Sequence, residues 1–125
     1  MSRPKNPTLT DGELRLMHVL WDKGEATVGE VLASLNEPRK PAYNTVLTLL
    51  RILERKGYLT HRKAGRAFTF LPVVDRAHAR QSALRTLVNR FFEGSPRLLV
   101  LNLMEGGELS EAAIEQLARK IEDMP

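Results

Sequence analysis

The chain contains no cysteine among its 125 residues. This absence excludes disulfide bonds, thiol catalysis and cysteine-based metal sites, and it fits a reducing compartment. No apolar run approaches the roughly 18 residues of a membrane span, and the polar start of the chain has no apolar core of a signal peptide. We therefore expect a protein without a signal peptide and without membrane insertion.

Catalytic motifs are missing as well. His18, His61 and His78 show no metal-ligand spacing, and the chain has no glycine-rich phosphate loop, no serine nucleophile motif and no metalloprotease motif. Glu111 and Glu115 form a carboxylate pair, but we expect them on an exposed helix face, where such pairs usually serve solvation. The sequence predicts no enzyme, no metal site and no cofactor.

Charge is distributed unevenly along the chain, although the net charge is only +4. Residues 38–66 contain eight Lys or Arg against one Glu, whereas residues 93–125 contain seven acidic residues against three basic ones. Basic surfaces attract nucleic acid because each phosphate contact releases condensed counterions. A merely solvated basic surface would show the same charges, so this pattern needs support from the order of the helices and strands.

Two capping boxes predict the first two helices. Thr10 with Glu13, and Thr27 with Glu30, place a hydroxyl and a carboxylate where each can satisfy an N–H group at a helix start. A glycine, Gly24, ends the first helix. The apolar stripe of the first helix is expected to consist of Leu14, Met17, Leu20 and Trp21.

A third helix follows the proline-containing turn 36–41 and runs to Gly57. One face of it is apolar, and the opposite face carries Asn44, Thr48, Arg51 and Arg55 without a carboxylate. Beyond Gly57, two runs with strand spacing surround Ala64-Gly65 and predict a β-hairpin with a basic tip. Farther along the chain, Asp75 and Ser110 are expected to cap two more helices, and an apolar segment at 98–104 lies between these helices.

Three helices followed by a basic hairpin match a winged helix-turn-helix, which binds DNA through its third helix. We expect a mainly α fold with a small β-hairpin wing, composed of a DNA-binding domain at 1–74 and a helical dimerisation domain at 75–125. Base edges would be read by Asn44, Thr45 and Thr48. Phosphates would be contacted by Arg39, Lys40, Arg51, Arg55, Arg62, Lys63 and Arg66. The alternative for the third helix is an ordinary surface helix.

The C-terminal third has more apolar surface than a small appendage can bury on itself. Pairing with a second copy would bury this surface and would supply two recognition helices for two half-sites of a double-stranded DNA operator. The residues expected in the homodimer are Leu84, Leu87, Val88, Phe91, Leu99, Leu101, Leu103, Ile114, Leu117 and Ile121. The alternative is that these helices fold back on their own chain.

Several motifs in this order resemble the penicillinase-repressor family of bacterial transcriptional regulators, the BlaI/MecI/CopY group. They are LTDGEL with the following methionine, leucine and tryptophan at 9–21, AYNTVLTLL at 42–50, RKGYL at 55–59, HRKAGRAF at 61–68 and LVLNL at 99–103. The resemblance implies a cytoplasmic homodimer that represses genes, in several members antibiotic-resistance genes, by occupying a dyad operator, often of TACA/TGTA type. It also implies release by a membrane sensor-protease that cuts the dimerisation region, here at the Asn102–Leu103 bond.

The chain departs from the family pattern at several positions. Leu103 replaces a phenylalanine at the cleavage bond, Asn44 replaces the first threonine of a doublet, and Ile52 replaces an arginine. The copper-responsive branch uses cysteines, which this chain lacks. Two functions from other classes remain open: a winged-helix protein-interaction module and a small-molecule-sensing regulator.

Overall fold

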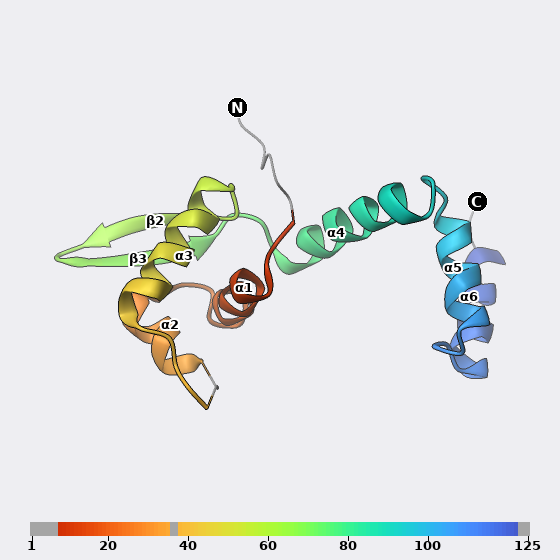
Figure 1. Cartoon of the computed structure of the whole chain (residues 1–125), viewed down its shortest axis with the longest axis horizontal. Coiled ribbons are helices and arrows are strands. Elements are labelled where there is room, and N and C mark those ends of the chain that lie inside the picture. The colour runs from red at the N-terminus through yellow and green to blue at the C-terminus, as the bar shows by residue number, and fades with distance from the viewer. Residues whose placement is uncertain (1–7, 36–37, 123–125) are drawn as a thin grey trace. The chain divides into compact units, whose positions relative to one another are not determined.

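The computed structural model describes residues 8–35 and 38–122, with the side chains of 121 and 122 left out. Its described part is mainly helical with one small sheet, which confirms the predicted fold class (Figure 1). The elements follow the order α1 (Asp11–Lys23), β1 (Ala26–Thr27), α2 (Val28–Ser34), α3 (Tyr43–Arg55), β2 (Leu59–Ala64), β3 (Ala67–Pro72), α4 (Arg76–Phe91), α5 (Pro96–Glu105) and α6 (Glu111–Glu122).

The predicted hairpin exists as β2 and β3, and a third strand extends it. The sheet is antiparallel with the order β1-β3-β2, in which Ala26 pairs with Phe70 and Thr27 with Thr69. A strand of two residues is too short to show an alternating pattern, so the sequence did not reveal β1. Because β1 lies between α1 and α2 in the chain, it anchors the hairpin to the helices.

The predicted helix caps are confirmed. The Thr10 hydroxyl accepts from the Glu13 N–H at 3.2 Å while the Glu13 carboxylate accepts from the Thr10 N–H at 2.9 Å. Thr27 and Glu30 form the same reciprocal pair at the start of α2. Asp75 and Ser110 also accept N–H bonds, from His78 and Ala113. Helices α4 and α6 therefore begin where the sequence predicts.

One core joins α1, α2, α3 and the sheet. Our prediction of the α1 stripe is wrong at Leu14, which is 37% exposed, because the helix turns Leu16 inward instead. Trp21 and Phe68 pack only partly buried at the edge of this core. The indole N–H of Trp21 donates to the Val74 carbonyl at 2.9 Å. The buried core consists of Leu16, Met17, Leu20, Ala26, Val28, Val31, Leu35, Val46, Leu50, Leu53, Tyr58, Leu59 and Phe70.

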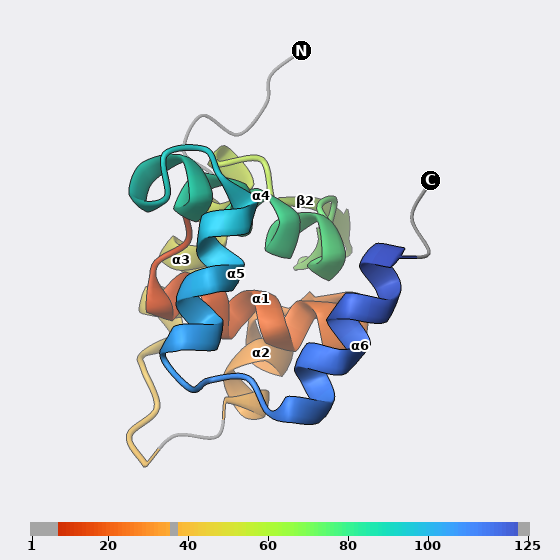
Figure 2. The same ribbon diagram turned by 90° about the vertical axis from the view of Figure 1, so that its right-hand side faces the viewer.

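The chain divides into two compact units, Met1–Ala83 and Leu84–Pro125, and the division falls inside α4. Helix α4 ends at Phe91, followed by Glu93 and Gly94 in the left-handed region, with φ of 52° and 76°. In the second unit, α5 and α6 form a helical hairpin (Figure 2). The functional boundary that we predicted at 74/75 stays a prediction, because a division by contacts assigns no role to either unit.

Candidate DNA interface

Helix α3 presents two different faces. Its buried side chains are Val46, Leu50 and Leu53, each with no exposed surface, and they hold the helix against α1 and α2. The helix begins at Tyr43, two residues after Pro41, and its N-cap residue Ala42 forms no side-chain cap hydrogen bond. An amphipathic helix held in this way has a fixed rotation about its axis, so the residues on its outer face are fixed as well.

The outer face of α3 carries the residues that we predicted to read bases. Asn44, Thr45 and Thr48 are all exposed, and their side chains form no hydrogen bond or ion pair with another described residue. Arg51 and Arg55 continue the same surface toward the C-terminal end of the helix and are also exposed. The structure therefore brings the three polar residues and the two arginines together on one accessible helix face.

One carboxylate lies on α3 among these groups. Glu54 is partly buried, and its two oxygens lie 2.8 and 2.9 Å from Nδ1 of His61 on β2. The His61 ring in turn contacts Phe68 and Phe70, with ring centroids 5.2 and 5.8 Å apart. Glu54 is thus directed at the wing, and it leaves the exposed face of α3 without an unpaired acid.

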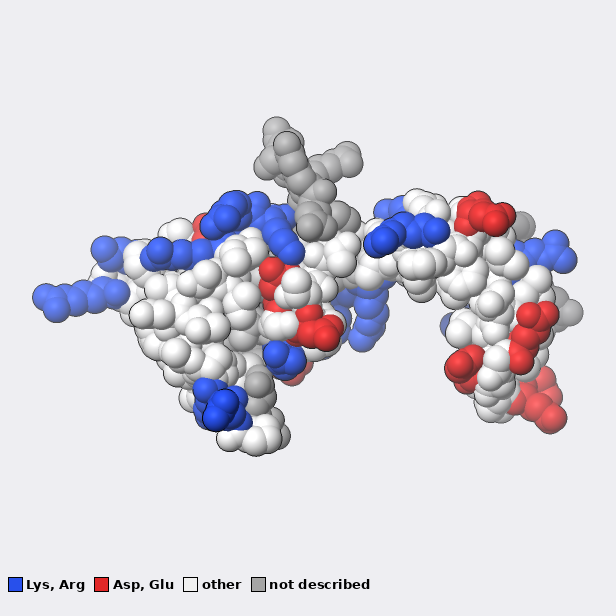
Figure 3. Space-filling view, in the orientation of Figure 1, with Lys and Arg blue, Asp and Glu red and all other residues white. Residues whose placement is uncertain are grey.

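A hollow of about 390 Å³ lies between α3 and the wing, beside the contact of Glu54 with His61. Its rim carries Arg51 and Arg55 from the helix, and its wall includes Phe68 from the wing. On the wing, Lys63 lies over the Phe68 ring at 5.6 Å, and Arg66 is exposed next to the turn at Gly65. Lys and Arg side chains gather on the wing and over the first unit in Figure 3.

The turn before α3 adds two more predicted phosphate contacts. Arg39 and Lys40 are exposed, and Lys40 Nζ donates to the Ala33 carbonyl at 3.3 Å. Together with Thr45, both residues line a second hollow of about 190 Å³. This turn therefore places cations at the N-terminal end of α3, where the residues predicted to read bases lie.

Arg62 differs from the other cations of the predicted interface. Its guanidinium donates to both oxygens of Glu25, at 2.8 and 2.7 Å. The hydrogen bonds from Arg62 hold the pKa of Glu25 below its ordinary value, and they raise the pKa of Arg62. We predicted that Arg62 contacts phosphate, but in the structure its guanidinium forms a bidentate ion pair with the Glu25 carboxylate.

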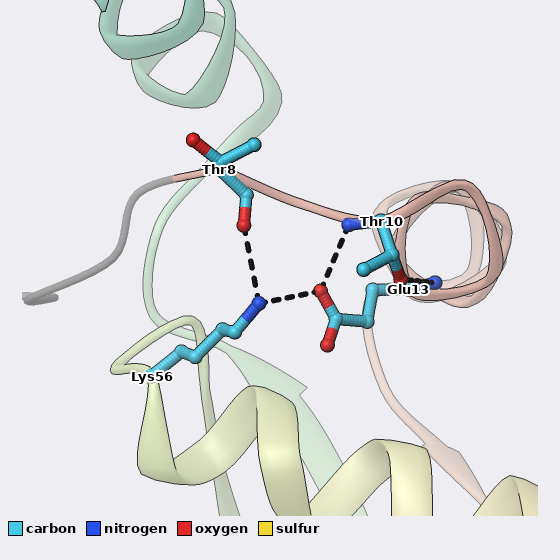
Figure 4. A network of polar contacts seen from close by, with 4 residues as sticks. All are labelled: Thr8, Thr10, Glu13 and Lys56. Carbon is cyan, nitrogen blue, oxygen red and sulfur yellow. Dashed lines mark hydrogen bonds and ion pairs between the residues drawn. The ribbon is translucent and has the colours of Figure 1, made fainter.

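A polar network that the sequence did not suggest holds the C-terminal end of α3 (Figure 4). Lys56 Nζ lies 2.7 Å from the Glu13 carboxylate and donates to the Thr8 carbonyl at 3.1 Å. Glu13 is 3% exposed. Burial alone raises the pKa of Glu13, but hydrogen bonds from Lys56 and Thr10 and the Lys56 charge outweigh burial and lower this pKa.

This network assigns new roles to two residues. The sequence showed Glu13 only as a capping residue and Lys56 only as part of the basic run, because the pair spans 43 positions. In the structure, Lys56 is directed inward, away from any phosphate role. The pair connects the start of α1 with the end of α3, so it helps to fix the position of the outer face of α3.

The residues predicted for dimerisation lie in the second unit. Phe91 is 67% exposed, the highest value among the large apolar residues that are exposed. Val88 is instead buried within its own chain, and the Ile121 side chain lies outside the described residues. Leu99, Leu103 and Ile114 are partly buried, whereas Leu84, Leu87, Leu101 and Leu117 are exposed.

The predicted cleavage bond lies inside a helix. Asn102 and Leu103 belong to α5, and the Asn102 side-chain amide donates to the Leu98 carbonyl at 3.3 Å. The helix ends shortly afterwards at Glu105, followed by Gly106 and Gly107. Within 8–35 and 38–122, no group of His, Cys, Asp and Glu is arranged to hold a metal ion.

Comparisons with known proteins show the family of the chain. The family model described as "Penicillinase repressor" matches residues 9–123. The penicillinase repressor of Bacillus licheniformis is 32% identical and is aligned over 95% of this chain and 93% of its own length. The methicillin resistance regulatory protein MecI of Mammaliicoccus sciuri is 25% identical, over 90% of this chain and 92% of its own length.

A solved structure supports the fold of the first unit. The solution structure of the DNA binding domain of the repressor BlaI is 32% identical, with a TM-score of 0.53, and the match covers 62% of this chain and 93% of that chain. No helix in the described part of our chain is long and apolar enough to cross a membrane. On the family match across nearly the whole chain, the protein belongs to the penicillinase repressor family and is a transcriptional repressor, not an enzyme.

Proposed function

We propose that this repressor binds a dyad operator as a homodimer, with α3 of each protomer in a major groove. The observation that carries this proposal is the outer face of α3. It presents Asn44, Thr45 and Thr48 without partners among the described residues, and its one carboxylate, Glu54, is directed at His61. Polar side chains on a helix flanked by cations suit base edges flanked by phosphates.

Each of these side chains has a proposed task. Asn44 can bond adenine through a bidentate amide pair, and Thr45 and Thr48 can bond base edges or contact a thymine methyl group. The phosphate contacts on either side would come from the exposed cations of α3, of the turn before it and of the wing tip. These cations are Arg39, Lys40, Arg51, Arg55, Lys63 and Arg66.

A homodimer is proposed because the second unit leaves apolar surface uncovered. Leu84, Leu87 and Phe91 are exposed on α4, and Leu101 and Leu117 are exposed on α5 and α6. Contiguous exposed apolar surface in a soluble chain commonly marks an interface. Two linked winged helices also bind two half-sites with an effective concentration that a monomer lacks, which makes repression tight.

Release by proteolysis is part of the same proposal. A cut at Asn102–Leu103 would divide α5 and separate α6 from the rest of the second unit. Proteases bind extended substrates, so the last turn of α5 must open before the bond is reached. Gly106 and Gly107 follow this turn directly and make it easier to open. A membrane sensor-protease would be the partner that acts on this bond in the cytoplasm.

The regulated genes are inferred from the relatives. A penicillinase repressor and a methicillin resistance regulatory protein align with this chain over nearly its whole length. We infer that this repressor also controls genes for resistance to cell-wall antibiotics.

Two other functions have less support. A protein-interaction module would use the basic face without distinguishing DNA sequences. A ligand-sensing regulator needs a pocket that orients a ligand. The hollow of about 570 Å³ beside Trp21 is lined by exposed Asp75 and His78, and it holds no buried charged side chain among the described residues.

Selection of bound duplexes from random DNA, followed by a gel shift with salt titration, tests the proposal. We expect a two-fold symmetric sequence, bound by two protomers and at least about 1000-fold more tightly than a scrambled duplex. Equal and weak binding to every sequence would contradict operator recognition and favour the protein-interaction module.

A further inference from the structure

The two faces of the wing carry different chemistry. Residues directly opposite in an antiparallel sheet lie on the same face, and neighbours along a strand lie on opposite faces. His61 is opposite Phe70, and Lys63 is opposite Phe68. The His61 ring contacts both phenylalanines and Glu54 of α3, so this face of the sheet is directed toward the recognition helix.

Arg62 lies on the other face. It is opposite Thr69, which in turn is opposite Thr27 of β1, so these three residues form one row across the three strands. From β2 at one edge, the guanidinium reaches Glu25, the residue directly before β1 at the other edge, with two bonds at 2.8 and 2.7 Å. The ion pair therefore spans the whole width of the sheet on the face opposite α3.

We propose that the Glu25–Arg62 ion pair is a brace that holds the wing at its working angle to α3, and that Arg62 is a positioning residue with no contact to phosphate. The part that concerns DNA rests on the proposed function. The brace is needed because β1 contributes only two residues to the sheet, while β2 and β3 extend farther to the tip. Without it, the wing that carries Lys63 and Arg66 would depend on the short pairing with β1, on the buried Phe70 and on the contact between His61 and Glu54.

Charge reversal separates a brace from a phosphate contact. The double variant Glu25→Arg/Arg62→Glu keeps the net charge and restores an ion pair of opposite orientation. If the pair is a brace, the double variant retains operator affinity within about twofold of wild type. Arg62→Glu alone then binds the operator more weakly than the double variant, because the new carboxylate repels Glu25. If Arg62 instead contacts phosphate, the double variant would lose as much operator affinity as Arg62→Glu alone. This result would overturn the proposal.

The salt dependence supplies a second readout. Arg62→Gln is expected to weaken operator binding by about two- to fivefold through loss of the brace, with an unchanged slope of log affinity against log salt. A slope that becomes shallower by about 0.9 would show that a phosphate contact has been lost, which would contradict the positioning role.

Amide hydrogen exchange tests the brace without DNA. Exchange at β2 and β3 should be faster in Glu25→Gln and in Arg62→Gln, by a similar factor, and should return toward the wild-type rate in the charge-swapped variant. Exchange that is unchanged in all three variants would overturn the brace even if DNA binding is normal. Conversely, a confirmed brace in a chain without sequence-specific DNA binding would leave the brace intact and contradict only the proposed function.

Discussion

The two compact units of this chain differ in how much apolar surface each buries by itself. The first unit has a core of thirteen buried apolar residues, drawn from three helices and the sheet. In the described part of the second unit, Val88 is the one buried apolar residue, and large apolar side chains on all three helices are exposed. The first unit thus buries a core of its own, whereas the second leaves large apolar side chains exposed, which is what the proposed homodimer would cover.

The two units also differ in the sign of their surface charge. Basic residues gather on the wing and around α3, while Figure 3 shows acidic side chains on the C-terminal helices. A basic surface attracts DNA and an acidic one is repelled by it. The comparison therefore supports our proposals that the first unit binds DNA and that the second associates with another copy of the chain.

Breaking the proposed interface should have the largest effect. Phe91→Glu places a charge on the most exposed large apolar residue in the described part of the second unit. We expect a monomer in sedimentation experiments and operator binding about 100-fold weaker, because the two half-sites are no longer bound jointly. Val73→Glu is the matched control, since Val73 is 58% exposed but lies in the first unit, and it should leave the dimer intact. A Phe91→Glu variant that remains dimeric would contradict the proposal that α4 forms part of the dimer interface.

The stability of the first unit should depend on the ion pair between Glu13 and Lys56. Glu13→Gln keeps the capping box but removes the charged partner of Lys56, at an expected cost of about 1.5–3 kcal/mol in the free energy of unfolding. Glu30→Gln changes the other capping box, which is exposed and has no lysine, so its cost should stay within about 0.5 kcal/mol. Urea unfolding of both variants measures the difference, and equal costs would contradict a special role for Lys56.

The same pair predicts a pH dependence. The pKa of Glu13 is lowered in the folded chain, so the carboxylate stabilises the fold above the ordinary glutamate pKa of about 4.3. This stabilisation is lost as the pH falls through the lowered folded-state pKa. The difference in unfolding free energy between wild type and Glu13→Gln should therefore be constant near neutral pH and should shrink below about pH 4. A difference that grows as the pH falls would contradict a lowered pKa of Glu13 in the folded chain.

Base recognition in the first unit should respond to single side chains of α3. Asn44→Ala or Thr48→Ala should reduce discrimination at one position per half-site by about 1–3 kcal/mol and relax the sequence preference there. Thr60→Ala is the control, because Thr60 is an exposed threonine on β2 away from α3. Competition binding against operators with single base changes measures the preference. An unchanged preference in both α3 variants would mean that another surface reads the bases.

The wing tip should show the smallest effect, visible mainly in the salt dependence. Lys63→Ala removes one proposed phosphate contact and should make the salt slope shallower by about 0.9 at every DNA sequence. Lys23→Ala at the end of α1 changes the net charge equally and should leave the slope unchanged. If both variants shift the slope alike, the wing acts only through the overall charge of the unit.

Local patterns allowed much of the first unit to be predicted from sequence. Both capping boxes, the end of α1 at Gly24 and the hairpin around Gly65 depend on residues only a few positions apart. The outer face of α3 follows from helical periodicity, so Asn44 and Thr48 were placed as the structure has them. Such features need no knowledge of the tertiary fold.

Features that depend on distant residues were not predictable in this way. Arg62 and Glu25 are 37 positions apart, and neither residue belongs to a pattern that indicates the other. The Glu13–Lys56 pair likewise forms only when α1 and α3 pack together. Leu14 and Leu16 both fit an apolar stripe, so the sequence alone does not show which of them is buried. The packing partners of α1 decide that Leu16 is the buried one.

Sedimentation equilibrium of the full chain without DNA tests the central comparison most directly. The account predicts a mass of twice the 14.1 kDa chain at micromolar concentration, because the second unit completes its core with another copy. A single chain mass throughout the concentration range, with the helices still folded by circular dichroism, would contradict it. The exposed residues of α4, α5 and α6 would then have to pack within their own chain or against a different partner.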